Sequence, residues 1–221
     1  SGGDARKLLN IIEIIINSFD DKSEITITNE IVTERLQENI ALYDKNGEQH
    51  YDLISAFIKS MRGSDPNGAI YWMARMLAGG EDPLFIARRM IILASEDVGL
   101  ANPNALLLAQ SCFDAVHKIG MPEARIILAE TCIYLATSPK SNSAYMAINN
   151  ALDLIAKEGT QAPVPLHLRN APTSLMKELG YGKDYKYAHD YAGGFVEQEF
   201  MPESLAGHTF YHPNTQNQQE Q

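Results

Sequence analysis

Five prolines at the starts of predicted helices constrain this chain most. Successive prolines are 17, 20, 19 and 17 residues apart, at Pro66, Pro83, Pro103, Pro122 and Pro139. Proline fits the first turn of a helix because its missing N–H has no helical partner there. A glycine follows most of the expected helix ends, and we expect Gly63 to take the left-handed conformation that closes a helix. The pattern predicts consecutive antiparallel helices of similar length.

Residues 50–103 carry the clearest part of this pattern and predict three helices. Asp65 and Asp82 each precede a proline, where a side-chain oxygen can accept a hydrogen bond from a free backbone N–H. Apolar residues recur with the period of one helix face. We expect the following residues to face the core: Leu53, Ile54, Phe57, Ile58 and Met61 in the first helix; Ile70, Met73 and Leu77 in the second; Leu84, Ala87, Met90, Ile91 and Ala94 in the third.

The later helices follow the same punctuation. We expect helices from Pro103 to about residue 119 and from Pro122 to about residue 136. A third, capped by Ser141 or Asn142, should run to Gly159. A short helix capped by Thr173 should end at Gly180. Pairs of about 37 residues also resemble helical-repeat solenoids. Because residues within the pairs do not repeat, a globular bundle is the preferred interpretation.

The two ends of the chain differ from the middle. Residues 3–19 open directly as an amphipathic helix, which indicates a piece of a longer chain. Residues 160–172 read as an extended segment. Residues 181–213 lack helical period but are dense in aromatic residues, so we expect them to pack on the helices or on another subunit. Residues 214–221 are polar, and we expect them to be disordered. The aromatic residues of the tail are Tyr181, Tyr185, Tyr187, Tyr191, Phe195, Phe200, Phe210 and Tyr211.

Composition narrows the class of protein. At 221 residues and 45% apolar, the chain can bury one sizeable core, alone or with a small appended piece. No apolar run approaches the roughly 18 residues that a membrane span needs. A net charge of −10 argues against tight binding of duplex DNA by this chain alone. Cys112 and Cys132 lie among apolar neighbours, which indicates free buried cysteines of a reducing cytoplasm and excludes a zinc site.

Catalytic motifs are missing from the sequence. The nearest match to a phosphate-binding loop, Gly182-Lys183, lacks both the following Ser or Thr and the upstream glycine. Glu96 and Asp97 could act as paired acids, but we prefer an arginine-paired or solvated helix end, because adjacent helical residues do not share a face. The histidines show no spacing for a metal site or triad and are interpreted as structural: His50, His117, His167, His189, His208 and His212.

Two helices are apolar around more than one face, which predicts a second cover beyond the core. That cover is either the aromatic tail or another subunit. The candidate residues for subunit contacts lie on these two helices: Tyr71, Trp72, Met76, Phe85, Arg88 and Arg89. For the arginines, the alternative is a surface salt-bridge pair, and for Trp72 it is a place in the core.

Several motifs carry a resemblance to a known family. Gly3-Asp4-Ala5-Arg6 resembles the sensor-2 element of AAA+ ATPases, whose arginine reaches the nucleotide phosphates. The stretches HYDLISAFIKSMRGSDPNGAIYWMARML, GEDPLFIARRMIILASEDVGLANP, PKSNSAY and VPLHLRNAPTSLMKELGYGKDYKYAHDY resemble the bacterial replication-associated recombination protein A family, RarA or MgsA. That family is related to the eukaryotic Werner-helicase-interacting ATPase.

The resemblance implies an all-α fold: a helical bundle of the clamp-loader collar type, a remnant of the AAA+ lid and an irregular wrapping tail. We expect the lid remnant at residues 1–45, the oligomerisation domain at 46–180, the packed tail at 181–213 and a disordered end at 214–221. Arg6 would contact nucleotide only in the full-length protein, which would use ATP and Mg. This fragment should need no cofactor and hydrolyse nothing.

The resemblance further implies a homotetramer in the cytoplasm, associated with the nucleoid and not with a membrane. Its partners, through the full-length protein, would be DNA and single-stranded DNA-binding protein, in replication-fork maintenance, recombination and repair. Two alternatives stay open. One is a helical scaffold that binds a peptide from a replication partner. The other is an all-helical enzyme that uses Glu96 and Asp97, but no nucleophile or base accompanies them.

Overall fold

A computed structural model describes residues 48–159 and 162–216, together with Ile12, Ile16 and Thr28. Throughout these residues the regular structure is helical and contains no strand, as the sequence predicts. The chain divides into two compact units, Ser1–Ser141 and Asn142–Gln221, each of which is considered by itself. Among the residues described, no helix is long and apolar enough to cross a membrane.

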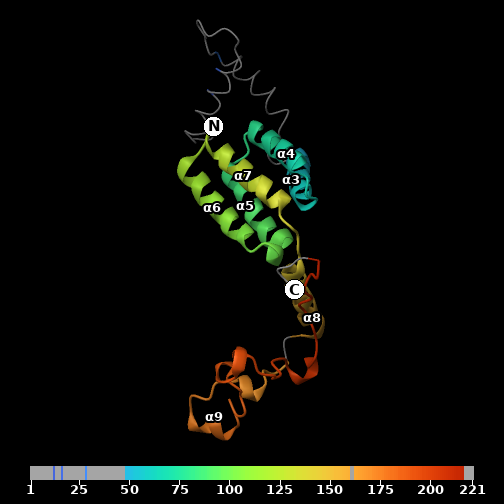
Figure 1. Ribbon diagram of the computed structural model, residues 1–221, viewed down its shortest axis with the longest axis vertical. Coiled ribbons are helices and arrows are strands. Elements are labelled where there is room, and N and C mark those ends of the chain that lie inside the picture. Colours follow the sequence, from blue (N-terminus) through green and yellow to red (C-terminus); the bar gives the residue numbers. More distant parts are fainter. Residues whose placement is uncertain (1–11, 13–15, 17–27, 29–47, 160–161, 217–221) are drawn as a thin grey trace. The chain divides into compact units, whose positions relative to one another are not determined.

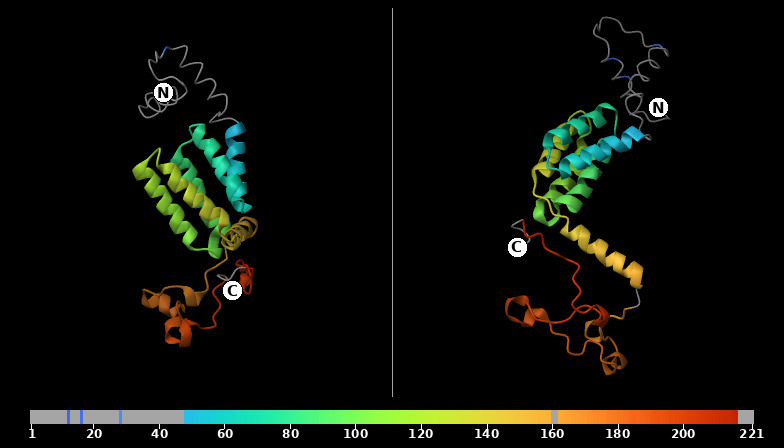
Figure 2. Two further views of the ribbon diagram at one scale, coloured as in Figure 1. Left: turned by 45° about the horizontal axis from the view of Figure 1, so that its top comes forward. Right: turned by 90° about the vertical axis from the view of Figure 1, so that its right-hand side faces the viewer.

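The described part of the first unit is a bundle of five α-helices: α3 (Glu48–Arg62), α4 (Pro66–Ala78), α5 (Pro83–Leu93), α6 (Asn104–Ile119) and α7 (Ala124–Thr137). Helices α3 and α4 lie side by side, as do α5 and α6 (Figures 1 and 2). Helix α7 contacts all four others, so it is apolar on most of its circumference. The bundle is closed around α7.

Of the thirteen residues that the helix periodicity places inside, eight belong to the buried core of the bundle, which also contains many residues that were not predicted. The largest fully buried side chains come from all the described helices of this unit except α6, and include Phe57, Met61, Met76, Ile86, Met90, Leu128 and Leu135. Helix α6 contributes small residues, Ala105, Ala109 and Cys112, which let it pack closely. Of the residues expected inside, Ile58, Ile70, Leu77, Leu84 and Ile91 are only partly buried at the edge of this core.

The helix starts form as the sequence predicts. The Asp65 side chain accepts hydrogen bonds from the backbone N–H groups of Asn67 and Gly68, both at 3.0 Å, and Pro66 opens α4. The Asp82 side chain accepts one from the N–H of Leu84 at 3.0 Å, and Pro83 opens α5. Each aspartate therefore satisfies backbone donors that the first helical turn leaves free.

The end of α3 differs from the prediction. Ser64, with φ of 60°, takes the left-handed conformation, whereas Gly63 does not. The N–H of Asp65 then donates to the Ser60 carbonyl at 2.9 Å, the hydrogen bond of a Schellman ending. The left-handed position falls one residue later because Gly63 still bonds to Lys59 in the helical manner, at 2.8 Å.

The third predicted helix also departs from regular α geometry before Gly99. Helix α5 gives way to a π-helical turn, η1 (Ala94–Val98), and then a 3-10 turn, η2 (Gly99–Ala101). The wider π turn changes the direction in which Glu96 and Asp97 project. Single π-helical turns inside α-helices are frequently found at functional sites.

The second unit begins with α8 (Ser143–Glu158), which ends at Gly159 with φ of 84°. Asn142 precedes it, without a side-chain capping hydrogen bond. The short α9 (Ser174–Glu178) is capped by Thr173, whose hydroxyl accepts from the N–H of Met176 at 3.3 Å, and Gly180 closes it. The regular structure in the other described residues of this unit consists of the 3-10 turns η3 (Leu166–Leu168), η4 (Ala188–Asp190), η5 (Ala192–Gly194) and η6 (Glu203–Leu205).

Candidate functional site

The candidate contact residues of α4 form one group on its surface. Tyr71 is 57% exposed, and its ring meets that of Trp72 edge-on, with centroids 4.9 Å apart. Trp72 is half-buried against the core, and the Arg75 guanidinium lies 5.6 Å from the centre of its ring. Met76 is 1% exposed and belongs to the core of the single chain. Its side chain is therefore not available to another subunit, but those of Tyr71 and Arg75 are.

The candidates of α5 form a second group at its first turns. Phe85 is half-buried, its ring centre 5.7 Å from that of His50. The Arg88 guanidinium lies 6.0 Å from the Phe85 ring centre and pairs with Asp82 at 3.3 Å. The alternative interpretation of Arg88, a surface salt bridge on a helix, therefore fits the structure.

Arg89 differs from its neighbour. Its side chain is half-buried, and its Nε is buried with no hydrogen-bond partner among the described residues. A buried guanidinium N–H without an acceptor costs free energy, typically about 1–3 kcal/mol, and more when the group is charged. Arg89 thus has an unused donor on α5.

Glu96 and Asp97 meet a single arginine. Arg62, at the end of α3, donates from Nε to Asp97 Oδ1 at 2.5 Å and from Nη2 to Asp97 Oδ2 at 3.2 Å. The same Nη2 lies 3.2 Å from Glu96 Oε1. The arginine-paired alternative is therefore the correct one. The argument that adjacent residues cannot share a face does not hold here, because the π turn brings both carboxylates to one guanidinium.

Lys140 and Ser141 join these residues in what we call the polar junction: Arg62, Ser64, Glu96, Asp97, Lys140 and Ser141. Lys140 Nζ donates to the carbonyls of Ser138 at 2.6 Å and Ala136 at 3.0 Å, and to Ser64 Oγ at 3.3 Å. The Ser141 N–H donates to the Asp97 carbonyl at 2.8 Å. Burial lowers the pKa of Lys140, and the nearby Asp97 charge opposes that shift. The junction fastens the segment after α7 to α3 and η1.

Sequence reasoning did not find this junction. Its members stand up to 79 residues apart, from Arg62 to Ser141, and no spacing rule connects them. In the sequence, only the glycine at position 99 hints at the junction. In the structure, Gly99 has a φ of 50°, and a Cβ there would lie 2.5 Å from the Ser141 carbonyl oxygen. A glycine between two apolar helices can mark such a close approach of backbones.

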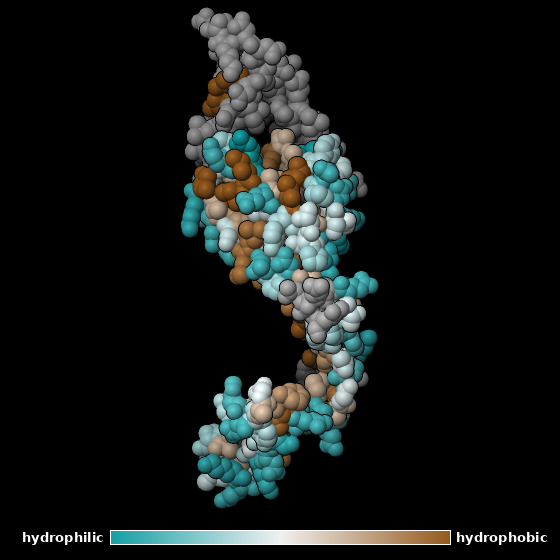
Figure 3. All heavy atoms as spheres, viewed as in Figure 1, coloured by the Kyte–Doolittle hydropathy of each residue, from teal (hydrophilic) through white to brown (hydrophobic). Residues whose placement is uncertain are grey.

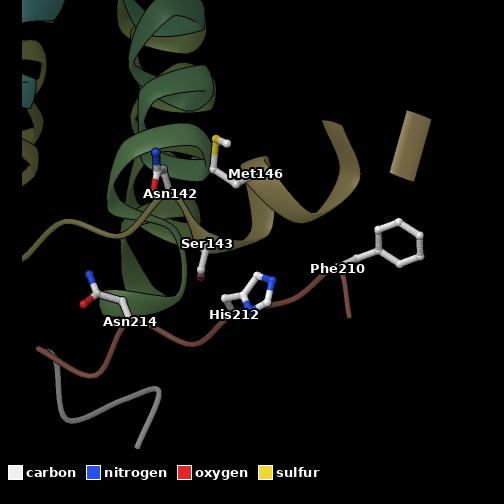
Figure 4. A pocket seen from close by; sticks show the side chains of 6 residues that line it. All are labelled: Asn142, Ser143, Met146, Phe210, His212 and Asn214. Atoms are coloured by element: carbon white, nitrogen blue, oxygen red, sulfur yellow. The ribbon is translucent and has the colours of Figure 1, made fainter. Parts of the chain in front are cut away.

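Two of the clefts formed by the described residues of the second unit have polar side chains in their lining. One, of about 240 Å³, lies where residues 210–214 run beside the first turn of α8, with His212 next to Ser143 (Figure 4). The end of the aromatic tail thus contacts α8, whereas the wider expectation that the tail covers the bundle stays a prediction. The lining residues are Asn142, Ser143, Met146, Phe210, His212 and Asn214.

The other cleft, of about 470 Å³, is lined by both charges: Lys183 and Lys186, and Asp184 and Glu199. Its walls are held by hydrogen bonds from the Lys186 N–H to Gln198 Oε1 and between His167 Nε2 and the Glu199 carbonyl, both 2.8 Å. The balance of charge gives it no preference for an anion or a cation. In this part of the chain, His167 has the structural role that the sequence predicts.

The described residues form neither a metal site nor a reactive thiol. No cluster of three or more potential metal ligands occurs among them. Cys112 and Cys132 are both free and buried, as predicted. Burial raises the pKa of the Cys132 thiol to about 12 and raises that of Cys112 as well. Neither thiol is therefore a reactive thiolate at neutral pH.

Arg6, the expected nucleotide contact, lies outside the described residues, as do residues 217–221 of the expected disordered end. What the described surface does show is exposed apolar area. Apolar side chains gather on the visible face of the first unit over α6 and α7 (Figure 3). Those with 40% exposure or more in these helices and the turn between them are Leu106, Leu107, Ile119, Met121, Ile126 and Ile133.

The described bundle is all helical and leaves apolar side chains exposed on α6 and α7. Comparison with protein families gives its class. Residues 1–62 match the family described as AAA C-terminal domain. Residues 63–221, well over half of the chain, match the family described as MgsA AAA+ ATPase C terminal, and the chain belongs to that family.

Curated relatives agree with this family. The chain is 44% identical over 213 residues to replication-associated recombination protein A of Coxiella burnetii, covering 96% of this chain and 48% of that protein. The protein of the same name from Escherichia coli K12 is 44% identical over 214 residues, with the same coverage. ATPase WRNIP1 of Dictyostelium discoideum is 40% identical over 228 residues, covering 95% of this chain and 26% of that protein. The chain spans about half the length of these bacterial relatives.

Proposed function

We propose that this chain is the assembly region of a RarA-type AAA+ ATPase that acts in replication-fork maintenance, recombination and repair. Membership of the MgsA C-terminal family supports the type of ATPase. The relatives named replication-associated recombination protein A support the process. In the whole protein, other residues would bind and hydrolyse ATP with Mg, and this chain would hold the subunits together.

The observation that carries the proposal is the apolar surface that the single chain leaves exposed. Leu107 is 67% exposed and Ile126 60%, and Tyr71 stands out from α4 to a similar degree. A monomer rarely exposes contiguous apolar patches beyond a few hundred Å². We infer a homotetramer, the arrangement that two self-complementary patches generate by closed symmetry.

In the proposed function, ATP hydrolysis and subunit assembly depend on different parts of the whole protein. Arg6 would contact ATP there as the sensor-2 arginine, while the chain alone should bind no nucleotide and hydrolyse nothing. DNA and single-stranded DNA-binding protein would be partners of the whole protein, in the cytoplasm at the nucleoid. Direct duplex binding by this chain should be weak, because a net charge of −10 repels phosphate and assembly multiplies that charge.

Tyr71 and Tyr51 have similar exposed fractions, so substituting each with glutamate tests whether an effect on assembly is specific to α4. Tyr71→Glu places a charge on the proposed contact face of α4, and Tyr51→Glu, on α3, is the matched control. Multi-angle light scattering should give four copies for the unmodified chain and for Tyr51→Glu, and fewer for Tyr71→Glu. Circular dichroism should show both variants folded, since neither side chain is in the core.

A monomer for the unmodified chain would remove the proposed function and favour the scaffold alternative, in which the exposed apolar faces bind a peptide. A tetramer for Tyr71→Glu would show that subunits meet elsewhere than at this part of α4.

A further inference from the structure

Helix α8 has an apolar face that no described residue of its own unit covers. Its large apolar residues Tyr145, Met146, Ile148, Leu152 and Ile155 are 42–56% exposed. None of its residues belongs to the buried core cluster. A 16-residue helix with no apolar side chain buried gains little from tertiary packing, which is where most helical stability in proteins arises. The face is therefore built for a contact with something else.

Four of these residues form a seam suited to another helix. Tyr145, Ile148, Leu152 and Ile155 are spaced 3, 4 and 3 residues apart, the spacing of the two apolar positions in a coiled coil. At 3.6 residues per turn they fall within an arc of about 80°. The positions beside the seam hold the small residues Ala144, Ala151 and Ala156, which permit close approach of a second helix.

The tail of the same chain lies on the other side of α8. Ser143 and Met146, which line the cleft with Phe210 and His212, fall roughly 140–160° around the helix from the centre of the seam (Figure 4). Charged positions avoid the seam as well: Asp153 and Lys157 fall on the side of Met146. The seam is thus both uncharged and free of the tail.

We propose that the seam of α8 pairs antiparallel with the α8 seam of a second copy of this chain, a contact that rests on the proposed assembly. The four seam positions are symmetric about residue 150. In an antiparallel pair centred there, Tyr145 faces Ile155 of the second copy and Ile148 faces its Leu152. Every apolar residue of the seam therefore meets an apolar residue, as a twofold contact requires.

The area of the α8 seam indicates whether this contact could hold two chains together by itself. With about half of each large side chain exposed, the four seam residues offer on the order of 400 Å² per copy, taking about 200 Å² for each. A stable interface usually buries about 800 Å² per partner. The α8 pair is therefore too small to act alone, and it serves as one of the two self-complementary patches of the tetramer, with the bundle providing the other.

Disulfide trapping tests this pairing in the full chain. Tyr145→Cys and Ile155→Cys are introduced together, and the folded protein is oxidised with diamide. Within one helix these positions are about 15 Å apart, beyond the roughly 7 Å that a disulfide can bridge, so any bond between them joins two chains. Buried Cys112 and Cys132 make the unmodified chain a suitable background.

We expect the double variant to run as a covalent dimer on a non-reducing gel, and Tyr145→Cys alone to stay monomeric there. Asn150→Cys, on the far side of the helix, controls for random collision and should also stay monomeric. Covalent dimers of Tyr145→Cys alone would mean parallel pairing and would overturn the proposal. Circular dichroism before oxidation checks folding, which these exposed positions should not disturb.

Light scattering of the unmodified chain separates the two proposals. Four copies without disulfides in the double variant would leave the assembly standing and overturn the α8 pairing. Two copies with the disulfides formed would do the reverse. Leu152→Asp gives an independent measurement: it should lower the mass of the tetramer to that of a dimer, and an unchanged mass would overturn the pairing.

Discussion

Replacing Arg62 with alanine tests how much the polar junction contributes to the stability of the bundle. In Arg62→Ala, Asp97 keeps its place in η1 but loses both hydrogen bonds from the guanidinium, and Glu96 loses its partner. The Asp97 side chain is only 10% exposed, so water cannot fully replace the lost donors. The variant should be less stable than the parent chain.

The structure sets the magnitude of this loss. Breaking a fully buried ion pair by removing one partner costs about 3–5 kcal/mol. Arg62 is 46% exposed and Lys140 remains near Asp97, so solvent and that second cation reduce the loss. We expect a decrease of about 2 kcal/mol in the free energy of unfolding. For a chain of this size, that corresponds to a decrease in Tm of roughly 4–8 °C.

Urea denaturation followed by circular dichroism, at one protein concentration, measures this change. Arg88→Ala is the matched control, because Arg88 pairs with Asp82 by the same chemistry on the surface, where the two side chains are 51% and 45% exposed. Surface pairs contribute at most about 1 kcal/mol, so Arg88→Ala should change stability by less than about 1 kcal/mol. Equal effects of the two variants would refute the argument that burial gives the junction its stability.

Two further predictions concern backbone approach and buried thiols. Gly99→Ala should destabilise the chain by about 2 kcal/mol or more, because its φ of 50° and ψ of −134° are strained for alanine and the methyl group would meet the Ser141 carbonyl. Gly80→Ala, with φ of 82° but open space around it, should cost only about 1 kcal/mol, and equal losses in urea titrations would contradict this. The raised pKa of Cys132 keeps the folded thiol protonated, so stability present below pH 9 should be lost as pH rises towards 12, by up to about 1.4 kcal/mol per pH unit. Cys132→Ala should lose less over that range, and parallel pH profiles of the two proteins would disprove the assignment.

The helix boundaries could be predicted because their signals are local. Asp65 and Asp82 cap the helices that they precede, and Gly120 and Gly159 follow the last helical residues of α6 and α8. These features depend on the hydrogen bonds of one turn, so neighbouring residues are enough to specify them. The left-handed Ser64 is one exception, because a serine at that position has no distinctive sequence signal.

The candidate site was less predictable, because it depends on contacts between distant residues. Apolar residues on two faces of α4 predict a second cover, which stays a prediction, and periodicity alone could not separate the buried Met76 from the exposed Tyr71. The polar junction depends on the π turn that aims Asp97 at Arg62, and no local rule predicts that turn. The seam of α8 could be listed from its sequence, but only the structure shows that the described residues of its unit leave it exposed.

Sedimentation equilibrium of the unmodified chain over a dilution series tests the central claim most directly. The proposed tetramer has a mass of four times 24.5 kDa at micromolar concentration. On dilution it should dissociate to half that mass, as the smaller contact, the α8 pair, separates. A mass of 24.5 kDa throughout the series would contradict it, because the apolar faces of α4, α7 and α8 would then stand exposed in a stable monomer.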